Sequence, residues 1–295
     1  MKNLKFSIVK HYKIFFSITI IFLLVGIGSM LVRGFNLGID FTGGSIMDLY
    51  FDKPVSVSEV RDVLKKNDLG NSIIQLGNSN GSESGQDVLI RTGVIDDGQR
   101  RSVMDSLKQD LGGFQIQRVE NVGATIGGEL IQQAVLAIVL SWVLMIAYIT
   151  FRFEFKFAIA AIIALIIDVT VTLSYFSLFQ MEMDSSFVAA LLTVVGYSVN
   201  GTIVIFDRIR ENLKIHRRSE SLTEMVDNSI WQTMTRSVYT VGTSLFAVVC
   251  IFLFGGETIR NFSFAMMVGF ASGAYTSTLL AGPMWLFLRG KKAGE

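Results

Sequence analysis

The apolar residues of this chain are concentrated in six long runs, and polar residues fill the stretches between them. The runs cover residues 14–32, 134–151, 157–179, 187–206, 238–254 and 262–288. A helix of about 20 residues is long enough to cross the ~30 Å hydrocarbon layer of a bilayer. The pattern therefore predicts six membrane-spanning helices.

Residues 34–128, between the first two runs, have the pattern of a soluble domain. Alternating segments predict strands, and apolar residues three or four positions apart predict helices. We expect strands at 44–51, 71–77, 87–93 and 114–120, and helices at 56–67 and 99–111. Ser56 and Glu59 have the spacing of a capping box, and the polar stretch 78–86 is expected to be a flexible hairpin tip. The order βαββαβ predicts a ferredoxin-like domain.

Composition agrees with a polytopic α-helical membrane protein that carries one α+β domain. Apolar residues make up 51% of the chain and charged residues 17%. We divide it into 1–33, the N-terminus and first membrane helix; 34–128, the ferredoxin-like domain; and 129–295, membrane helices two to six. The single cysteine, Cys250, argues against a disulfide framework. The first run ends without an A-x-A-like cleavage site and is expected to be retained.

Basic residues recur at alternate ends of the apolar runs. They are Lys2, Lys5, Lys10 and Lys13 before the first run, Arg152 and Lys156 after the second, Arg208, Arg210, Lys214, Arg217 and Arg218 after the fourth, and Arg289, Lys291 and Lys292 after the sixth. Cytoplasmic loops of membrane proteins carry the excess of lysine and arginine. Both termini are therefore expected in the cytoplasm, and the domain 34–128 on the other side of the membrane.

The fourth apolar run carries a small and polar stripe. Thr193, Gly196, Asn200 and Asp207 are spaced so that they share one face of a helix. Because lipid offers an amide no hydrogen-bond partner, this face is expected to contact protein or water. The mixed charges of Asp207 and Arg208, where the helix leaves the membrane, are expected to be solvated or locally ion-paired.

Two more charged residues lie in or next to apolar runs. Asp168 is near the centre of the third run, where an ionised carboxylate costs about 2.5–3.5 kcal/mol on insertion scales. It is either protonated and hydrogen-bonded to a neighbouring Ser, Thr or Asn, or it is a proton or cation site. Arg236, at the inner end of the fifth run, either extends to the headgroups or lines a hydrated interior with Thr240, Thr243 and Ser244.

Several classes of function have no support in the sequence. It contains no Gly-Lys-Ser/Thr phosphate loop and no triad-like arrangement, so ATP hydrolysis, proteolysis and enzymatic activity in general are not expected. His11 and His216 lack the neighbours of a metal site. No cofactor, metal or nucleic-acid partner is expected. Gly269 and Gly273 in the sixth run have the spacing of a close helix-packing motif.

Two stretches resemble a known family. They are FNLGIDFTGGS directly after the first run and GYSVNGTIVIFDRIREN in the fourth, with motif residues Gly38, Asp40, Gly43, Gly44, Gly196, Asp207 and Arg208. With them, and with its layout of six spans and one domain, the whole chain resembles the SecF family of the RND superfamily. Independently of the resemblance, Asp40, Gly43 and Gly44 are expected to form a structural joint between the first span and the first strand.

The resemblance implies an auxiliary subunit of the bacterial Sec protein translocase. SecF-family proteins pair with SecD and associate with the SecYEG channel, with YajC or YidC as further candidates, in the cell membrane. The resemblance also implies use of a proton or sodium gradient to help move or release the preprotein after SecA has pushed it.

One departure from the family changes the expectation for ion coupling. Where the family usually reads Asn-Asp, this chain has Asn200 and Gly201, and the missing carboxylate is the one associated with coupling, together with an arginine that corresponds to Arg236. The fourth span is therefore expected to be mainly a packing and hinge element, with Gly201 allowing close approach to the partner. Ion coupling would then run through SecD or, as the second choice, through Asp168.

Two other classes of function stay open at this point. One is a half of an RND-type exporter of lipids or small molecules, against which stands the small size of the domain 34–128. The other is a non-energised assembly or binding subunit, which the glycine at position 201 keeps under consideration.

Overall fold

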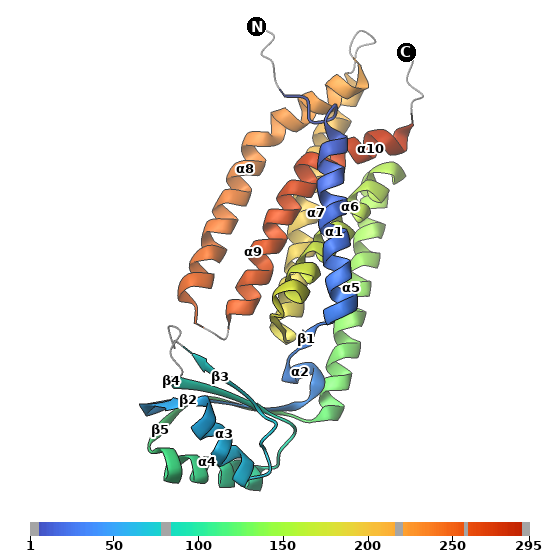
Figure 1. Ribbon diagram of the computed structural model, residues 1–295. Helices are drawn as coiled ribbons and strands as arrows, with labels where there is room; N and C mark the ends of the chain where they lie inside the picture. The colour runs from blue at the N-terminus through green and yellow to red at the C-terminus, as the bar shows by residue number, and fades with distance from the viewer. Residues whose placement is uncertain (1–5, 78–83, 216–220, 257–258, 291–295) are drawn as a thin grey trace. The chain divides into compact units, whose positions relative to one another are not determined.

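The computed structural model describes residues 6–77, 84–215, 221–256 and 259–290, and the statements below concern these residues. The chain divides into two units. Figure 1 shows the chain coloured by residue number. We call residues 37–135 the sheet unit and residues 1–36 with 136–295 the membrane unit. The division falls inside one long helix, α5 (Ala124–Arg152). The domain limits expected at 33/34 and 128/129 stay predictions.

The sheet unit contains the expected succession of elements. They are α2 (Ile39–Thr42), β2 (Gly44–Ser56), α3 (Val57–Lys66), β3 (Ile73–Gly77), β4 (Ser84–Thr92), α4 (Asp97–Leu111) and β5 (Phe114–Val122). The strands form one sheet in the order β3-β4-β2-β5, with each neighbouring pair antiparallel. The predicted hairpin of β3 and β4 is confirmed, and the strand order is that of a ferredoxin-like split βαβ arrangement.

Sequence-encoded caps and alternating apolar residues produce this unit. The capping box of Ser56 and Glu59 is present at the start of α3, and the hydrogen bonds from the Ser56 backbone and hydroxyl hold the pKa of the Glu59 carboxyl below its usual value. Asp96 caps α4 by accepting from the Gln99 backbone N–H at 2.7 Å. Alternate residues of the strands and one face of each helix meet in a single core. That core includes Met47, Leu49, Phe51, Val60, Leu64, Val88, Ile90, Val103 and Leu107.

Two strands are longer than the sequence predicts. β2 continues past Phe51 through Pro54 to Ser56, with an irregular register between Tyr50 and Val55. β4 begins at Ser84, so the last three residues of the expected tip 78–86 belong to a strand; residues 78–83 lie outside the described residues. Proline has no N–H to donate to a sheet, which is why the sequence pattern alone places the end of β2 before it.

The unit is expected to fold without the membrane helices, because its apolar pattern is complete within itself. Residues 36–125 expressed alone should give the circular-dichroism spectrum of a mixed α/β protein and a cooperative thermal transition. A spectrum of an unstructured chain would contradict the domain assignment.

Two glycines form the joint that leads into β2. The short helix α2 contains Asp40 and follows Gly38, and it ends at Gly43, whose φ is +71°. Gly44 has φ +142°, and a Cβ there would lie 2.6 Å from the Thr92 carbonyl oxygen. Residues with a side chain rarely adopt these backbone angles, so both positions require glycine.

Gly43→Val is expected to reduce the amount of full-length protein that accumulates in the membrane and assembles, because a β-branched residue is strained at this φ. Membrane content and complex recovery measure this. A variant that assembles normally but selectively loses secretion would instead assign Gly43 a direct functional role.

The membrane unit holds most of the long helices. Its elements are α1 (Tyr12–Arg33), the second part of α5, α6 (Phe155–Phe179), α7 (Ser185–Lys214), α8 (Leu222–Phe254), α9 (Arg260–Tyr275), the π-helix η2 (Thr276–Ala281) and α10 (Gly282–Arg289). The two-residue strand β1 (Asn36–Leu37) lies at the boundary of the two units in the sequence, and β6 (Glu182–Met183) precedes α7. Among the described residues six helical segments are long and apolar enough to cross a membrane, as predicted.

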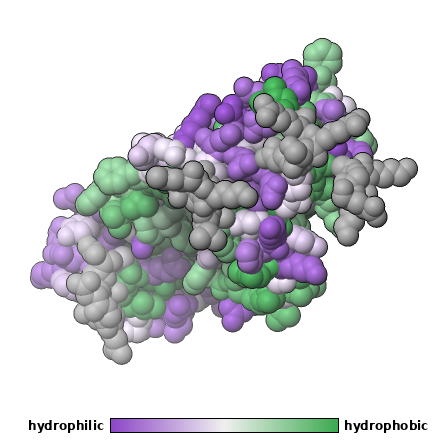
Figure 2. Space-filling view, turned by 90° about the horizontal axis from the view of Figure 1, so that it is seen from above, coloured by the Kyte–Doolittle hydropathy of each residue, from purple (hydrophilic) through white to green (hydrophobic). Residues whose placement is uncertain are grey.

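The start of α1 and the end of α10 lie at the same end of the membrane unit (Figure 1). At this end the Lys156 ammonium donates to the Arg289 carbonyl at 3.2 Å, and Arg210 donates to the Arg152 carbonyl at 3.3 Å. Figure 2 looks onto this end and shows hydrophilic residues exposed among hydrophobic ones. Four of the basic residues that the charge pattern singled out, Arg152, Lys156, Arg210 and Arg289, therefore lie at one end of the helices.

Helix α6 lies at the centre of the membrane unit's core. Its buried residues include Phe157, Ala161, Ala164 and Phe176, which pack with residues of α7 and α10 in one cluster. The stretches of α8 and α5 that would cross the membrane are, in contrast, largely uncovered within the chain. Many residues of α6 are thus packed on all sides, whereas most of the spanning parts of α5 and α8 is left uncovered within this chain.

Candidate intramembrane site

The structure places Asp168 of α6 at the meeting point of three helices. Its side chain is fully buried. Ser272 of α9 donates to Asp168 Oδ1 at 2.6 Å, and Thr276 of η2 lies 2.9 Å from Oδ2 and 3.0 Å from Oδ1. Ser198 of α7 also donates to Oδ2. The carboxylate is therefore held by three hydroxyl groups, from α7, α9 and η2.

The helix interruption next to this carboxylate follows from the sequence. Pro283 lies two residues beyond η2. Proline has no N–H, and its ring crowds the carbonyl four residues earlier, here that of Leu279. A wider π turn is one of the ways in which a membrane helix accommodates such a defect. Thr276, which contacts both oxygens of Asp168, is the first residue of this wider segment.

Two glycines of α9 allow that helix to lie close to α7. A Cβ at Gly269 would be 2.2 Å from Val194 Cγ2, and one at Gly273 would be 3.1 Å from Ser198 Cβ. The small-residue spacing is thus confirmed as a packing motif. It brings Ser198 of α7 and Ser272 of α9 within reach of the same carboxylate.

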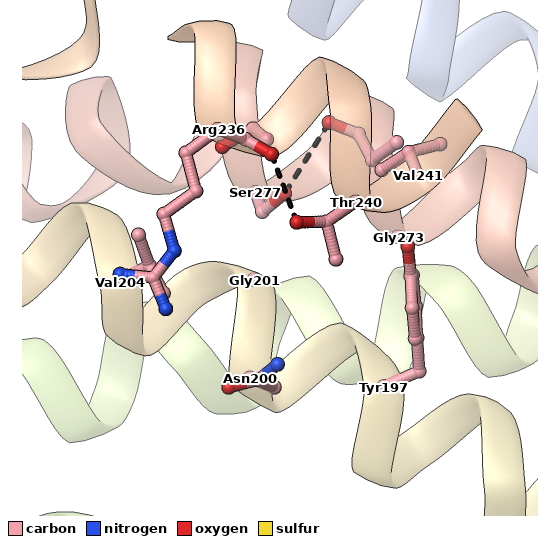
Figure 3. A pocket seen from close by; sticks show the side chains of 11 residues that line it. Tyr197, Asn200, Gly201, Val204, Arg236, Thr240, Val241, Gly273 and Ser277 are labelled. Carbon is pink, nitrogen blue, oxygen red and sulfur yellow. Dashed lines mark hydrogen bonds between the residues drawn. The ribbon is translucent and has the colours of Figure 1, made fainter. Parts of the chain in front are cut away.

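A second polar group of residues surrounds a small cavity between α7, α8 and α9. The cavity has a volume of about 60 Å³ and is lined by Tyr197, Asn200, Gly201, Val204, Arg236, Ser237, Thr240, Val241, Gly273, Ala274 and Ser277. Figure 3 shows the Arg236 side chain extending from α8 toward the part of α7 that carries Gly201 and Val204. The predicted candidates Asn200, Gly201 and Arg236 are therefore brought together, and Asp168 is not among the residues that line this cavity.

Only one of the three hydroxyl residues expected beside Arg236 reaches the cavity. Thr240 lines it, and its hydroxyl donates to the Arg236 carbonyl at 2.9 Å. Thr243 and Ser244 are not part of the lining, and their hydroxyls donate to the Tyr239 and Thr240 carbonyls of their own helix, each at 2.9 Å. A hydrated interior lined by all three is therefore not found.

Within this chain, Ser277 lies close to Gly201, and the close approach of a partner at Gly201 stays a prediction. A Cβ at this position would lie 3.2 Å from Ser277 Oγ, tighter than an ordinary contact. Ser277 follows Thr276, so neighbouring residues of η2 contact the cavity and Asp168. The residues around Asp168 and the residues around the cavity therefore lie on either side of the place where α7 packs against α9 and η2.

The polar stripe of α7, Thr193, Gly196, Asn200 and Asp207, lies on an exposed face of the membrane unit. Thr193 donates to the Ala189 carbonyl of its own helix at 2.8 Å. Asp207 pairs with Arg152 at 3.7 Å, with both side chains about half exposed. Arg208 pairs with Glu211 at 2.6 Å. The locally ion-paired exit of the helix is thus found as predicted.

Sequence reasoning missed several members of these groups. Ser198 and Ser277 carried no signal of their own, although Ser272 and Thr276 share a helix face with the glycine motif.

Asp227, near the start of α8, was also missed. It accepts from the Val9 backbone N–H at 2.9 Å and from the Ser7 hydroxyl, and these bonds attach the N-terminal segment to α8. The described residues contain no cluster of His, Cys, Asp and Glu able to hold a metal ion.

Comparison with known proteins relates this geometry to one family. The family model for the C-terminal part of the protein export membrane proteins SecD and SecF matches residues 102–291, and the SecD/SecF GG motif matches residues 28–55. The protein translocase subunit SecF of Acidaminococcus fermentans is 70% identical over 288 residues, covering 97% of this chain and 98% of the relative. The chain belongs to the SecF family. The SecF subunit of Sebaldella termitidis is 38% identical over 96% of this chain.

The similarity extends to solved SecDF structures. The crystal structure of SecDF, a translocon-associated membrane protein from Thermus thermophilus, superposes with a TM-score of 0.87 at 30% identity, over 97% of this chain and 39% of that one. A second SecDF structure, in a super-membrane-facing form, gives a TM-score of 0.71 at 30% identity. This chain thus spans about two fifths of the longer SecDF chain. As a member of the SecF family, this chain is a protein translocase subunit, and Asp168 and the cavity around Arg236 lie in its membrane unit.

Proposed function

We propose that the chain pairs with SecD and helps preproteins to cross, and to leave, the cytoplasmic membrane with energy from an ion gradient. In this proposal the complex of the chain with SecD associates with the SecYEG channel, with YajC or YidC as further partners. Both termini are cytoplasmic and the sheet unit lies outside the cytoplasm. The basic residues Arg152, Lys156, Arg210 and Arg289, which lie at the end of the membrane unit where α1 begins and α10 ends, support this orientation.

The exposed polar face of α7 and α8 is the observation that carries the pairing. Asn200 and Arg236 both lie in spanning segments and are exposed in the single chain. Lipid cannot satisfy an amide or a guanidinium, so a protein surface has to cover this face in the bilayer. A second half of the kind joined in the longer SecDF chains supports SecD as that surface.

Ion coupling in the complex with SecD runs through SecD or, as the second choice, through Asp168 of this chain. Asn200 cannot titrate and Gly201 has no side chain. The burial of Asp168 among three hydroxyl donors of separate helices makes it the carboxylate of this chain best placed to respond to a helix movement.

Site-directed cross-linking tests the pairing. In a Cys250→Ser background, Thr193→Cys on the polar stripe should cross-link to SecD in intact membranes. Leu24→Cys is the matched control, because Leu24 is a 66% exposed residue of α1, a helix that packs against α6. Absence of any SecD cross-link at position 193, together with no co-purification of SecD and SecYEG, would refute the pairing and return the RND-type exporter to consideration.

A second measurement separates an energised from a non-energised subunit. Secretion of a preprotein into vesicles that contain the complex should slow when the ion gradient is collapsed while ATP is kept constant. Secretion that depends on the complex but not on the gradient would favour the non-energised binding subunit.

A further inference from the structure

An apolar groove lies between α1, α6 and α9, apart from the cavity around Arg236. Its volume is about 470 Å³, and its twelve lining residues come from these three helices alone. Phe264, Val268 and Tyr275 line it from one face of α9. Gly273, which meets α7, lies on the other side of that helix. The groove therefore faces away from the surface of α7 and α8 that we assign to SecD.

The groove lies at membrane depth and is apolar along most of its length. The three segments that line it are long and apolar enough to cross a membrane. Two of its hydroxyl groups, those of Thr19 and Tyr275, donate to the Phe15 carbonyl of α1 at 2.9 and 2.8 Å. These groups are therefore satisfied within the chain, and an occupant of the groove does not have to supply hydrogen bonds to them.

The groove is long and narrow. It extends along α9 from Phe264 to Tyr275, which is about 16 Å of helix, so that its volume corresponds to a mean cross-section of about 30 Å² and a width of about 6 Å. A helix with its side chains is about 10–12 Å across. A spanning helix of a partner is therefore too wide to enter the groove, whereas a single hydrocarbon chain fits its width.

An arginine lies close to one end of the groove. The Arg33 guanidinium, on the exposed last turn of α1, donates to the Leu178 carbonyl of α6 at 3.2 Å. Leu178 is about one helical turn beyond Tyr175, which lines the groove. A guanidinium has several N–H groups, so Arg33 retains donors that suit a phosphate. The alternation of basic residues does not account for Arg33, because Lys10 and Lys13 lie at the other end of α1.

We propose that this groove binds one acyl chain of a membrane phospholipid whose phosphate group contacts Arg33. The chain lies along α6 and α9, and the headgroup stays at the membrane surface beside the end of α1. The bound lipid connects α1 to α9 across α6. It also covers Ser272, which lines the groove and donates to Asp168 Oδ1 at 2.6 Å. The acyl chain thus keeps water away from the Asp168 carboxylate on this side.

Photo-cross-linking with a lipid tests the site. The full-length protein, with the partner subunit that copurifies with it, is reconstituted in vesicles of phosphatidylethanolamine and phosphatidylglycerol. The vesicles contain a trace of phosphatidylglycerol with a diazirine in one acyl chain. Adducts located by mass spectrometry should be several-fold more frequent on residues 264–275 than on Leu24 and Val25, two exposed residues of α1 outside the groove.

Two substitutions separate the acyl chain from the headgroup. Ala271→Phe fills the groove and should lower its labelling several-fold, whereas the matched control Ala147→Phe, at an exposed position of α5, should leave it unchanged. Arg33→Gln should lower labelling of the groove by the phosphatidylglycerol probe. It should not lower labelling by a diazirine-bearing alkane, which has no phosphate.

Several outcomes would overturn the proposal. Labelling of residues 264–275 no stronger than that of Leu24 and Val25 would mean that lipid only solvates the surface. Labelling unchanged by Ala271→Phe would place the lipid outside the groove, and labelling by the phosphatidylglycerol probe unchanged by Arg33→Gln would remove the headgroup contact. In a Cys250→Ser background, cross-linking of Ala271→Cys to another protein in place of lipid would show that a partner closes the groove.

Discussion

Gly269→Val is expected to prevent stable packing of α9 against α7. A Cβ at position 269 would lie 2.2 Å from Val194 Cγ2 and 2.9 Å from Val194 Cβ, and Val194 is fully buried. Neither helix can move away without separating Ser198 and Ser272 from Asp168. Overpacking of this kind costs about 1–3 kcal/mol or more, and the valine adds two further methyl groups to the clash.

Thermal unfolding in detergent measures the effect, with the reaction of a thiol-specific dye at Cys250 as the signal. Gly242→Val is the matched control, because nothing lies within 4 Å of a Cβ at Gly242 of α8. The position-269 variant should melt well below the wild type or fail to accumulate, whereas the control should melt close to it. Equal melting of the two variants would show that α7 and α9 are not packed this closely.

Asp168→Ala is expected to produce the second-largest loss of stability. It removes the acceptor shared by Ser198, Ser272 and Thr276 and leaves a space between three helices. Hydrogen bonds between membrane helices contribute about 0.6 kcal/mol each on average, so three lost bonds amount to about 2 kcal/mol before the cavity is counted.

Asp168→Asn is the matched control for this effect. It has nearly the same shape and keeps one acceptor oxygen, so it should recover more than half of the stability lost in the alanine variant. Thermal unfolding of both variants, beside Ser198→Ala, measures the contributions. An alanine variant as stable as the wild type would mean that the hydroxyl groups find other partners, and that Asp168 does not hold α6, α7 and α9 together.

The features that were predictable from sequence depend on local periodicity. The strands of the sheet unit and the helix that begins after Ser56 follow from alternation, capping residues and turn residues that lie next to one another in the chain. The membrane helices follow from run length. Their ends were less predictable: α8 begins at Leu222, because Ser221 and Glu224 form a capping box well before the apolar run at 238–254.

The composition of the two polar groups could not be predicted, because each is assembled from several helices. Nothing near Asp168 in sequence indicates that Ser198, 30 residues away, and Thr276, 108 residues away, meet its carboxylate. The π-helix depends on how Pro283 is accommodated in the packed bundle. The glycine at 201 could be recognised as an unusual residue, but its neighbour Ser277 became clear only from the packing of η2.

The central claim is that α7 contributes no carboxylate at Asn200 and Gly201, in its membrane-spanning part, so that coupling to the ion gradient runs through SecD or Asp168. The complex with SecD is reconstituted in vesicles that contain a pH-sensitive dye, and gradient-driven flux is compared for wild type, Asn200→Ala and Asp168→Asn. We predict that Asn200→Ala retains flux with the complex intact. A loss of flux in Asp168→Asn would assign coupling to this chain, and retained flux would assign it to SecD. Abolition of flux by Asn200→Ala alone, in an intact complex, would contradict the account.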